Sequence, residues 1–203
     1  MTEQRVLGHW RGVAIEIALW DGAAAEVELS IACMFERELG DAGPMGGLRH
    51  LDQALDGALT ALRREGSFRA APLETLLISR PPAAVAAPAV AVIGLGDPTA
   101  WSPALTAQAA AAAVRLAVQQ GATSAAFAPS LLDAGLDRAA TGGVATAMLD
   151  AVIGAIDVQS RLVARGLASP FALRRWVFDV GAAGFAATAE RFQASLVATY
   201  RAG

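Results

Sequence analysis

The sequence predicts a single α/β domain in which helices cover a largely parallel sheet. In the second half of the chain, short apolar segments alternate with long helical ones, and such strand–helix–strand crossovers join parallel strands. The segment AVAVIGL (residues 89–95) is almost wholly apolar, as expected for a strand that is covered on both faces. The 203 residues, of which 55% are hydrophobic, suffice for one core, so residues 1–203 are expected to form one domain.

The first elements are two expected strands, residues 13–19 and 26–35, which are rich in β-branched and apolar side chains. The sequence DGAAA between them starts with an Asp-Gly pair that predicts a turn. Further on, leucines recur every three or four residues, which predicts one continuous helix over residues 48–64 that ends at Gly66.

The remaining elements alternate between strand and helix patterns. Strands are expected over residues 73–79, 89–95, 124–132 and 174–180, and helices over residues 106–120, 142–166 and 185–201. The first of these helices is alanine-rich and is closed by Gly121. The order of these elements is that of an open sheet with helices packed on it.

Composition and charge exclude several partners. The net charge is -3, from 19 acidic and 16 basic residues, and no basic run is present, so neither nucleic acid nor an anionic membrane is an expected partner. No stretch reaches the roughly 20 apolar residues of a membrane span. The single cysteine, Cys33, lies in the apolar run SIACMF and is expected to be a buried hydrophobe in a reducing compartment. A cytoplasmic location is therefore predicted.

Two residue types are missing from the chain, which contains neither lysine nor asparagine. Schiff-base chemistry, a lysine general base and a P-loop lysine are therefore excluded. The two histidines, His9 and His50, are far apart in sequence, and neither has a second ligand at helical spacing. Asp52 and Asp56 lie one helical turn apart and are expected to form a solvated acidic edge rather than a catalytic pair. We expect no catalytic residue, no metal site and no cofactor.

The stretch AVAVIGLGDPTAWSP (residues 89–103) joins a strand to a helix through a glycine-containing loop. Gly94 and Gly96 match the first two glycines of a dinucleotide-binding fingerprint, but Thr99 occupies the place of the third. Asp97 follows the strand, where open α/β sheets form their ligand crevices. Gly94, Gly96 and Asp97 are thus candidates for ligand binding, and the alternative is a plain crossover turn.

One long stretch in the middle of the chain resembles part of a known family. The stretch GGLRHLDQALDGALTALRREGSFRAAPLETLLI, followed by AVAVIGLGDP and an alanine-rich helix, resembles the amino-terminal domain of the leucine aminopeptidase (cytosol aminopeptidase) family. The features that agree are a Leu51-Asp52 pair in a helix, Gly57 one turn on, and a strand ending in Gly-Leu-Gly. Their order and spacing agree over residues 46–121.

The resemblance implies a three-layer α/β/α fold similar to macro domains, with a mixed, largely parallel sheet. In that family the peptidase activity belongs to a carboxy-terminal domain, where a lysine and several carboxylates hold two metal ions. This chain has no lysine and no Asn-Thr-Asp-Ala-Glu-Gly-Arg stretch. The resemblance therefore implies a free-standing, non-catalytic domain, to which no metal ligand is carried over.

A second stretch, DRAATGGVATAMLDAV (residues 137–152), resembles the glycine-rich segment with which macro domains hold the phosphates of ADP-ribose. Gly142 and Gly143 precede Val144-Ala145, where a helix begins, and the exposed backbone N–H groups at a helix N-terminus can bind phosphate without lysine. The chain departs from macro domains in lacking the asparagines that usually precede this segment. The alternative is an ordinary helix start with Thr141 as N-cap. Thr141, Gly142, Gly143 and Val144 are therefore ligand-binding candidates for ADP-ribose or a related nucleotide.

The last expected helix carries Phe185, Phe192, Leu196 and Tyr200 at spacings near four and seven. This stripe packs on the sheet of its own domain or meets a partner, either a second copy or a separately encoded catalytic subunit. The sequence thus favours a non-catalytic domain with an interaction, assembly or regulatory role. Binding of ADP-ribose or a related nucleotide at Gly142-Gly143 is the alternative.

Overall fold

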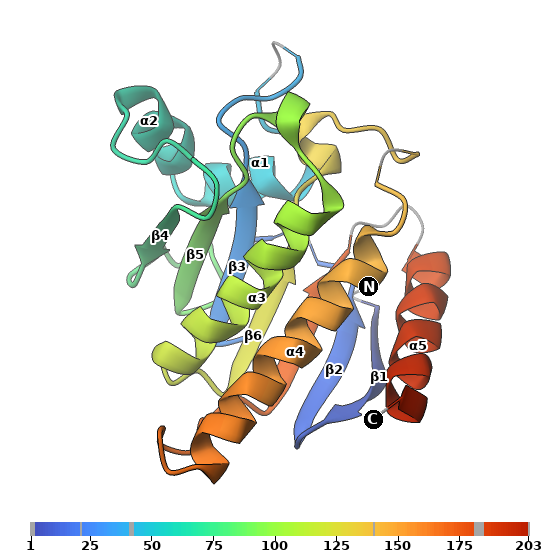
Figure 1. The fold of residues 1–203 in the computed structure, drawn as a ribbon. Coiled ribbons are helices and arrows are strands. Elements are labelled where there is room, and N and C mark those ends of the chain that lie inside the picture. The colour runs from blue at the N-terminus through green and yellow to red at the C-terminus, as the bar shows by residue number, and fades with distance from the viewer. Residues whose placement is uncertain (1–2, 21, 41–42, 140, 181–184, 203) are drawn as a thin grey trace.

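A computed structural model describes residues 3–20, 22–40, 43–139, 141–180 and 185–202 of the chain. Within these residues one seven-stranded sheet forms, in the order β1-β2-β7-β6-β3-β5-β4 (Figure 1). The strands are β1 (Gln4–Trp10), β2 (Val13–Ala18), β3 (Leu29–Met34), β4 (Thr75–Ile78), β5 (Ala89–Gly94), β6 (Ser124–Ala128) and β7 (Arg175–Asp179). Strands β2, β7, β6, β3 and β5 run parallel, and β1 and β4 pair antiparallel at the edges. The predicted mixed, largely parallel sheet is confirmed.

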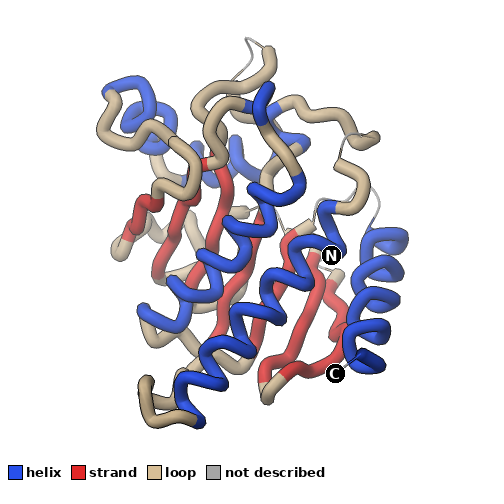
Figure 2. The backbone as a smooth tube through the Cα atoms, in the orientation of Figure 1, coloured by secondary structure: helices blue, strands red, loops and turns tan. Residues whose placement is uncertain are grey.

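Helices cover both faces of this sheet, which gives the expected three layers. The helices are α1 (Gly46–Ala54), α2 (Ala58–Glu65), α3 (Pro103–Gln119), α4 (Val144–Ala164) and α5 (Phe185–Ala202), with single turns η1 (Pro98–Ala100) and η2 (Leu132–Ala134). Helices α3 and α4 lie side by side on one face, and α5 packs next to α4 and β1 (Figures 1 and 2). Helices α1 and α2 lie on the other face. None of the described helices is long and apolar enough to cross a membrane.

The alternation of side chains along each strand divides the core between the two faces. On β3, Ile31 and Cys33 join the core under α3, α4 and α5, whereas Ala32 and Met34 join the core under α1 and α2. The prediction that the strand at 89–95 is covered on both faces is confirmed in the same way. Cys33 is the buried hydrophobe that was expected, and burial raises the pKa of its thiol far above the ordinary range, so the reactive thiolate is disfavoured.

The sequence prediction omitted β1, which forms a hairpin with β2. The two connecting residues, Arg11 and Gly12, have φ angles of 49° and 82°, the left-handed values that a tight two-residue hairpin turn requires. Arg-Gly is not one of the usual pairs for this turn, and most of β1 is exposed, so the segment lacks the alternation of a half-buried strand. Asp21, in the turn predicted after β2, lies outside the described residues.

The expected continuous helix over residues 48–64 is wrong, because the chain forms two helices. Asp56 and Gly57 both have positive φ angles, 55° and 77°, and separate α1 from α2. Asp52 explains why a second helix begins there: its buried carboxylate accepts hydrogen bonds from the backbone N–H groups of Leu59, at 2.9 Å, and Thr60, at 3.3 Å, and from the Thr60 hydroxyl. The expectation of a solvated edge is therefore wrong for Asp52, whose role is structural.

The last two helices also settle alternatives that the sequence left open. Thr141 is not the N-cap of α4; Gly143 is, with a φ of 82°, and the Thr141 hydroxyl donates instead to the Arg138 carbonyl at 2.9 Å. In α5, the stripe of Phe185, Phe192 and Leu196 faces the core. The stripe therefore packs on its own sheet, while the side chain of Tyr200 lies outside the described part.

Candidate functional site

A cavity of about 730 Å³ lies at the carboxyl ends of β3, β6 and β7. Most of its walls come from four parts of the chain: the start of α1, the segment between β6 and α4, the first two turns of α4, and one face of α5. Trp20 and Gly22 after β2 and the ends of the strands complete the lining. Because parallel strands present their carboxyl ends at the same edge, the loops that follow them meet there, as they do in open α/β sheets generally. The volume is in the range of small-molecule sites.

The segment after β6 supplies most of one wall. Ser130 turns the chain away from the strand with a φ of 51°, and the turn η2 follows directly. Gly135, with a φ of 89°, then ends η2 in the left-handed conformation that glycine adopts without strain. The short turn thereby keeps the residues after the strand at the rim of the cavity.

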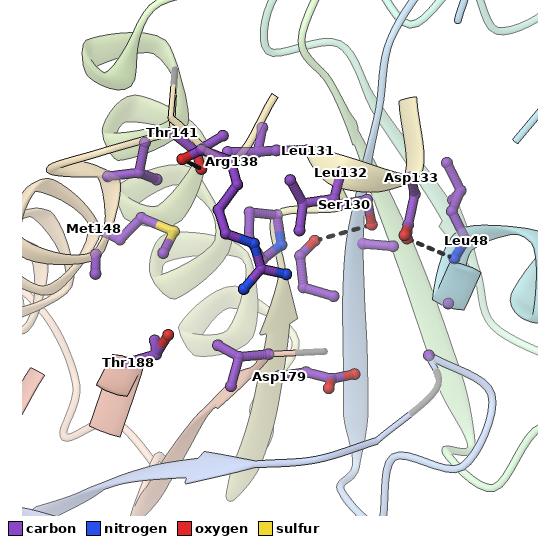
Figure 3. Close-up of a pocket in the computed structure, with 18 of the residues that line it drawn as sticks. Leu48, Ser130, Leu131, Leu132, Asp133, Arg138, Thr141, Met148, Asp179 and Thr188 are labelled. Atoms are coloured by element: carbon purple, nitrogen blue, oxygen red, sulfur yellow. Dashed lines mark hydrogen bonds between the residues drawn. The ribbon is translucent and has the colours of Figure 1, made fainter. Parts of the chain in front are cut away.

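Asp133 joins this segment to α1. Its backbone carbonyl accepts from the Met45 N–H at 2.9 Å, and its carboxylate accepts from the Leu48 N–H at 2.9 Å, so it caps the first turn of α1 from outside (Figure 3). Gly46 permits this approach, because a Cβ there would lie 2.1 Å from the Asp133 Oδ1. Burial raises the pKa of Asp133, although the hydrogen bond from Leu48 and the charge of His50 oppose this.

Two arginines line the side of the cavity that lies opposite α1. The Arg138 side chain extends from the segment before α4 into the middle of the cavity, between Met148 and the Ser130 wall (Figure 3). Arg191 and Thr188 lie three residues apart on α5 and both line the cavity, so they share one helix face. The walls thus comprise an apolar side at α1 and a cationic side at α4 and α5.

The start of α4 adds a further positive feature on this side. The Val144 N–H donates to the Thr141 carbonyl at 3.3 Å, and the first hydrogen bond of the regular helical pattern runs from the Ala147 N–H to the Gly143 carbonyl at 3.2 Å. The N–H groups of Ala145 and Thr146, which lie between them, therefore point out of the end of the helix. The aligned peptide dipoles of a 21-residue helix place partial positive charge there. An anionic group in this part of the cavity would therefore be stabilised.

The structure brings together some of the candidate residues from the sequence. Thr141, Gly142 and Val144 line the cavity, and Gly143 caps the helix between them. The Gly142 Cα faces open space, since an added Cβ would meet only the Ala139 carbonyl at 3.4 Å.

Gly94 and Gly96 do not line this cavity. A Cβ on Gly94 would lie 2.1 Å from the Ala71 carbonyl oxygen, and one on Gly96 would lie 2.8 Å from the Pro72 Cγ. The two glycines therefore let the segment at Ala70, Ala71 and Pro72 approach the end of β5.

Asp97, the third candidate of that loop, also lies outside the cavity walls. Its carboxylate accepts from the Thr99 N–H at 2.9 Å, which caps η1, and pairs with Arg37 at 2.9 Å. The hydrogen bonds from Thr99, together with the charge of Arg37, lower the pKa of Asp97. These contacts are those of a crossover turn.

Sequence reasoning missed the polar groups that line the cavity outside residues 141–144, namely Ser130, Asp133, Arg138, Asp179, Thr188 and Arg191. Open α/β sheets form their ligand crevices at the carboxyl ends of strands, and from the sequence this rule was applied only to the end of β5. Applied to the other strands, the rule would have found three of these residues, because Ser130 and Asp133 follow β6 and Asp179 ends β7. Nothing local marks Thr188 and Arg191, which reach the cavity through the packing of α5. Among the described residues, no group of three or more His, Cys, Asp or Glu could hold a metal ion.

A family model described as the cytosol aminopeptidase family, N-terminal domain, matches residues 34–157. A search of curated proteins finds no match.

Among solved structures, a K354E mutant of tomato leucine aminopeptidase is similar, with 20% identity and a TM-score of 0.64. The match covers 91% of this chain and 37% of that one, so the chain spans little more than a third of the enzyme's length. The Oceanobacillus iheyensis macrodomain with ADP shares 12% identity at a TM-score of 0.61, covering 98% and 99% of the two chains. The Trypanosoma brucei macrodomain in complex with ADP shares 14% identity at 0.58, covering 90% and 68%. At these identities the structural likeness establishes the fold.

Proposed function

The chain belongs to the cytosol aminopeptidase family through its N-terminal domain, and from this premise we propose that it is a non-catalytic module that binds a small nucleotide-type ligand. The observation that carries the proposal is the cavity of about 730 Å³ at the carboxyl ends of β3, β6 and β7. The macrodomains of Oceanobacillus iheyensis and Trypanosoma brucei, which share the fold, are named as complexes with ADP. This likeness supports the choice of a nucleotide.

The walls of the cavity suit the two halves of such a ligand. Leu132, which is 43% exposed on the wall beside α1, offers apolar surface to a base, whereas Arg138 and the start of α4 offer positive charge to phosphates. The proposal assigns no peptidase activity to the chain. It is supported by the match to the N-terminal domain of the family and by the lack of lysine, which the resemblance implies as a metal ligand of the family's catalytic domain.

A thermal-shift experiment with ADP and ADP-ribose tests the proposal. Either ligand at a hundred times its dissociation constant should add about 2.7 kcal/mol to the free energy of unfolding, which raises the midpoint by a few degrees. The variant Gly142→Leu should abolish the shift, because its side chain would project toward the cavity. Gly154→Leu is the matched control, since Gly154 lies on α4 away from this cavity and a Cβ there meets nothing within 4 Å. An unchanged midpoint with both nucleotides would contradict the proposal.

A second candidate role is docking to another protein chain, as a homo-oligomer or on a separately encoded catalytic subunit. Three large apolar side chains, those of Leu39, Met45 and Leu132, are 42–44% exposed near the rim of the cavity. Backbone bonds hold them close together, because the Leu39 N–H donates to Ala134 and the Met45 N–H donates to Asp133. Exposed apolar surface of this kind favours a protein contact.

Light scattering coupled to size-exclusion chromatography tests the homo-oligomer form of this role. A dimer is the expected result at high protein concentration, and Leu132→Glu should return it to a monomer because the charge would have to be buried in the contact. The matched control is Val158→Glu, which changes an exposed valine on α4 that is far from this patch in sequence and lines a different cavity. If the unchanged protein elutes as a monomer at every concentration, self-association through this patch is wrong.

A further inference from the structure

The charges around the cavity are unevenly distributed between its walls. Arg138 and Arg191 stand on the α4 and α5 side. The carboxylates of Asp133 and Asp179 accept hydrogen bonds from backbone N–H groups of the protein, Leu48 for Asp133 and Trp20 for Asp179. Both carboxylates thus take part in holding the walls together, whereas the guanidinium group of Arg138 extends into the cavity itself (Figure 3).

Contacts of α5 with its neighbours fix the position of the helix turn that carries Arg191, the second arginine. The hydroxyls of Thr146 on α4 and Ser195 on α5 are 3.0 Å apart, and Phe192 stacks on Phe178 of β7 with 4.4 Å between ring centres. These contacts hold α5 against α4 and the sheet. Residues 187, 188 and 191 therefore face the start of α4 across the cavity.

Two guanidinium groups and a helix start concentrate positive charge on this side of the cavity. A planar guanidinium group binds two oxygens of one phosphate at once, and the interaction strengthens when that phosphate carries a second negative charge. A terminal phosphate monoester is such a group, because it is mostly doubly charged at neutral pH. A phosphate that is esterified on both sides carries one charge only.

We infer that Arg138 and Arg191 hold a terminal phosphate, so that the cavity selects nucleotides that end in a phosphate monoester over those whose phosphates are capped by a sugar. This inference rests on the proposed nucleotide binding and names the ligand class for it. ADP, with a free terminal phosphate, is preferred over ADP-ribose, in which a neutral ribose follows the diphosphate.

Isothermal titration calorimetry of the intact chain with ADP and with ADP-ribose tests the inference. The unchanged protein should bind ADP at least about fivefold more tightly than ADP-ribose. In the double variant Arg138→Gln and Arg191→Gln, the affinity for ADP should fall about tenfold or more and the ratio of the two affinities should approach one. Arg161→Gln is the matched control, because Arg161 is an exposed arginine in the last turn of α4, at the opposite end from the cavity.

The outcomes separate this inference from the proposal on which it rests. An equal or stronger affinity for ADP-ribose in the unchanged protein overturns the selection for a terminal phosphate and leaves nucleotide binding in place. A preference for ADP that the double variant retains overturns the role of the two arginines. Binding of neither nucleotide overturns both. A lower thermal midpoint of the double variant without ligand would indicate a structural effect, and the single variants would then measure the ratio of affinities separately.

Discussion

Replacing Gly94 with alanine should lower the free energy of unfolding by at least about 3 kcal/mol, because the new methyl group has no space. It would lie 2.1 Å from the carbonyl oxygen of Ala71 and within 2.5 Å of the carbonyl atoms of Ala70. These are backbone atoms, and they cannot move aside: the Gly96 N–H donates to the Ala70 carbonyl, and Gly94 itself is bonded through its N–H and its carbonyl to Glu74 and Leu73. Chemical denaturation measures the change.

Gly142→Ala is the matched control for Gly94→Ala. An added Cβ at Gly142 would meet only the Ala139 carbonyl at 3.4 Å, so we expect a loss of less than about 1 kcal/mol. The sequence offered both glycines as ligand-binding candidates, and the pair of variants separates a glycine needed for close packing from one beside a cavity. Equal losses for the two variants would contradict this distinction.

Replacing Arg63 with methionine should cost about 3 kcal/mol, because it leaves a buried carboxylate without its partner. Two nitrogens of the Arg63 guanidinium group donate to the two oxygens of Glu38, at 2.8 and 2.9 Å, and one also donates to the Phe35 carbonyl. The side chains are only 13% and 10% exposed. The pair attaches α2 to the segment that follows β3, so denaturation should begin at lower urea concentration in the variant.

Two further variants make this prediction specific to a buried pair. Arg37→Met breaks the pair of Arg37 with Asp97, whose side chains are 54% and 44% exposed, and should leave the urea midpoint nearly unchanged because solvent screens the pair. The double variant Arg63→Met and Glu38→Gln should recover part of the loss, since no buried charge then remains. If Arg63→Met and Arg37→Met cost the same, burial is not the cause.

Regular patterns in the sequence were sufficient to predict much of the fold. The strands in the second half of the chain and the alanine-rich helix before Gly121 follow from apolar runs and helical spacing, which are local properties. Strand β1 escaped prediction because an exposed edge strand needs no apolar alternation. The break between α1 and α2 escaped it because leucines continue at helical spacing across Asp56 and Gly57, while the cause of the break is the buried Asp52 carboxylate.

The candidate cavity was predictable only where it follows from topology. Residues 141–144 were found because a glycine-rich segment before a helix has a known physical use. The position of Asp133 after β6 follows from the same topology, but its contact with Leu48 could not be predicted, since it joins segments 85 residues apart. Arg191 could not be predicted as a lining residue at all, because a surface arginine on a helix reaches the cavity only when α5 packs against α4 and the sheet.

The position of β7 in the sheet has a consequence for how the domain folds. This strand is the last of the seven along the chain, yet it lies between β2 and β6 and pairs with both. Until residues 175–179 are in place, the hairpin of β1 and β2 has no hydrogen-bonded neighbour in the rest of the sheet. A ribosome that has released only the first 170 residues would therefore expose two incomplete sheets, each with an open edge that can pair with other chains. Completion of the fold depends on a late, long-range strand insertion, which is expected to make folding slow for a domain of this size.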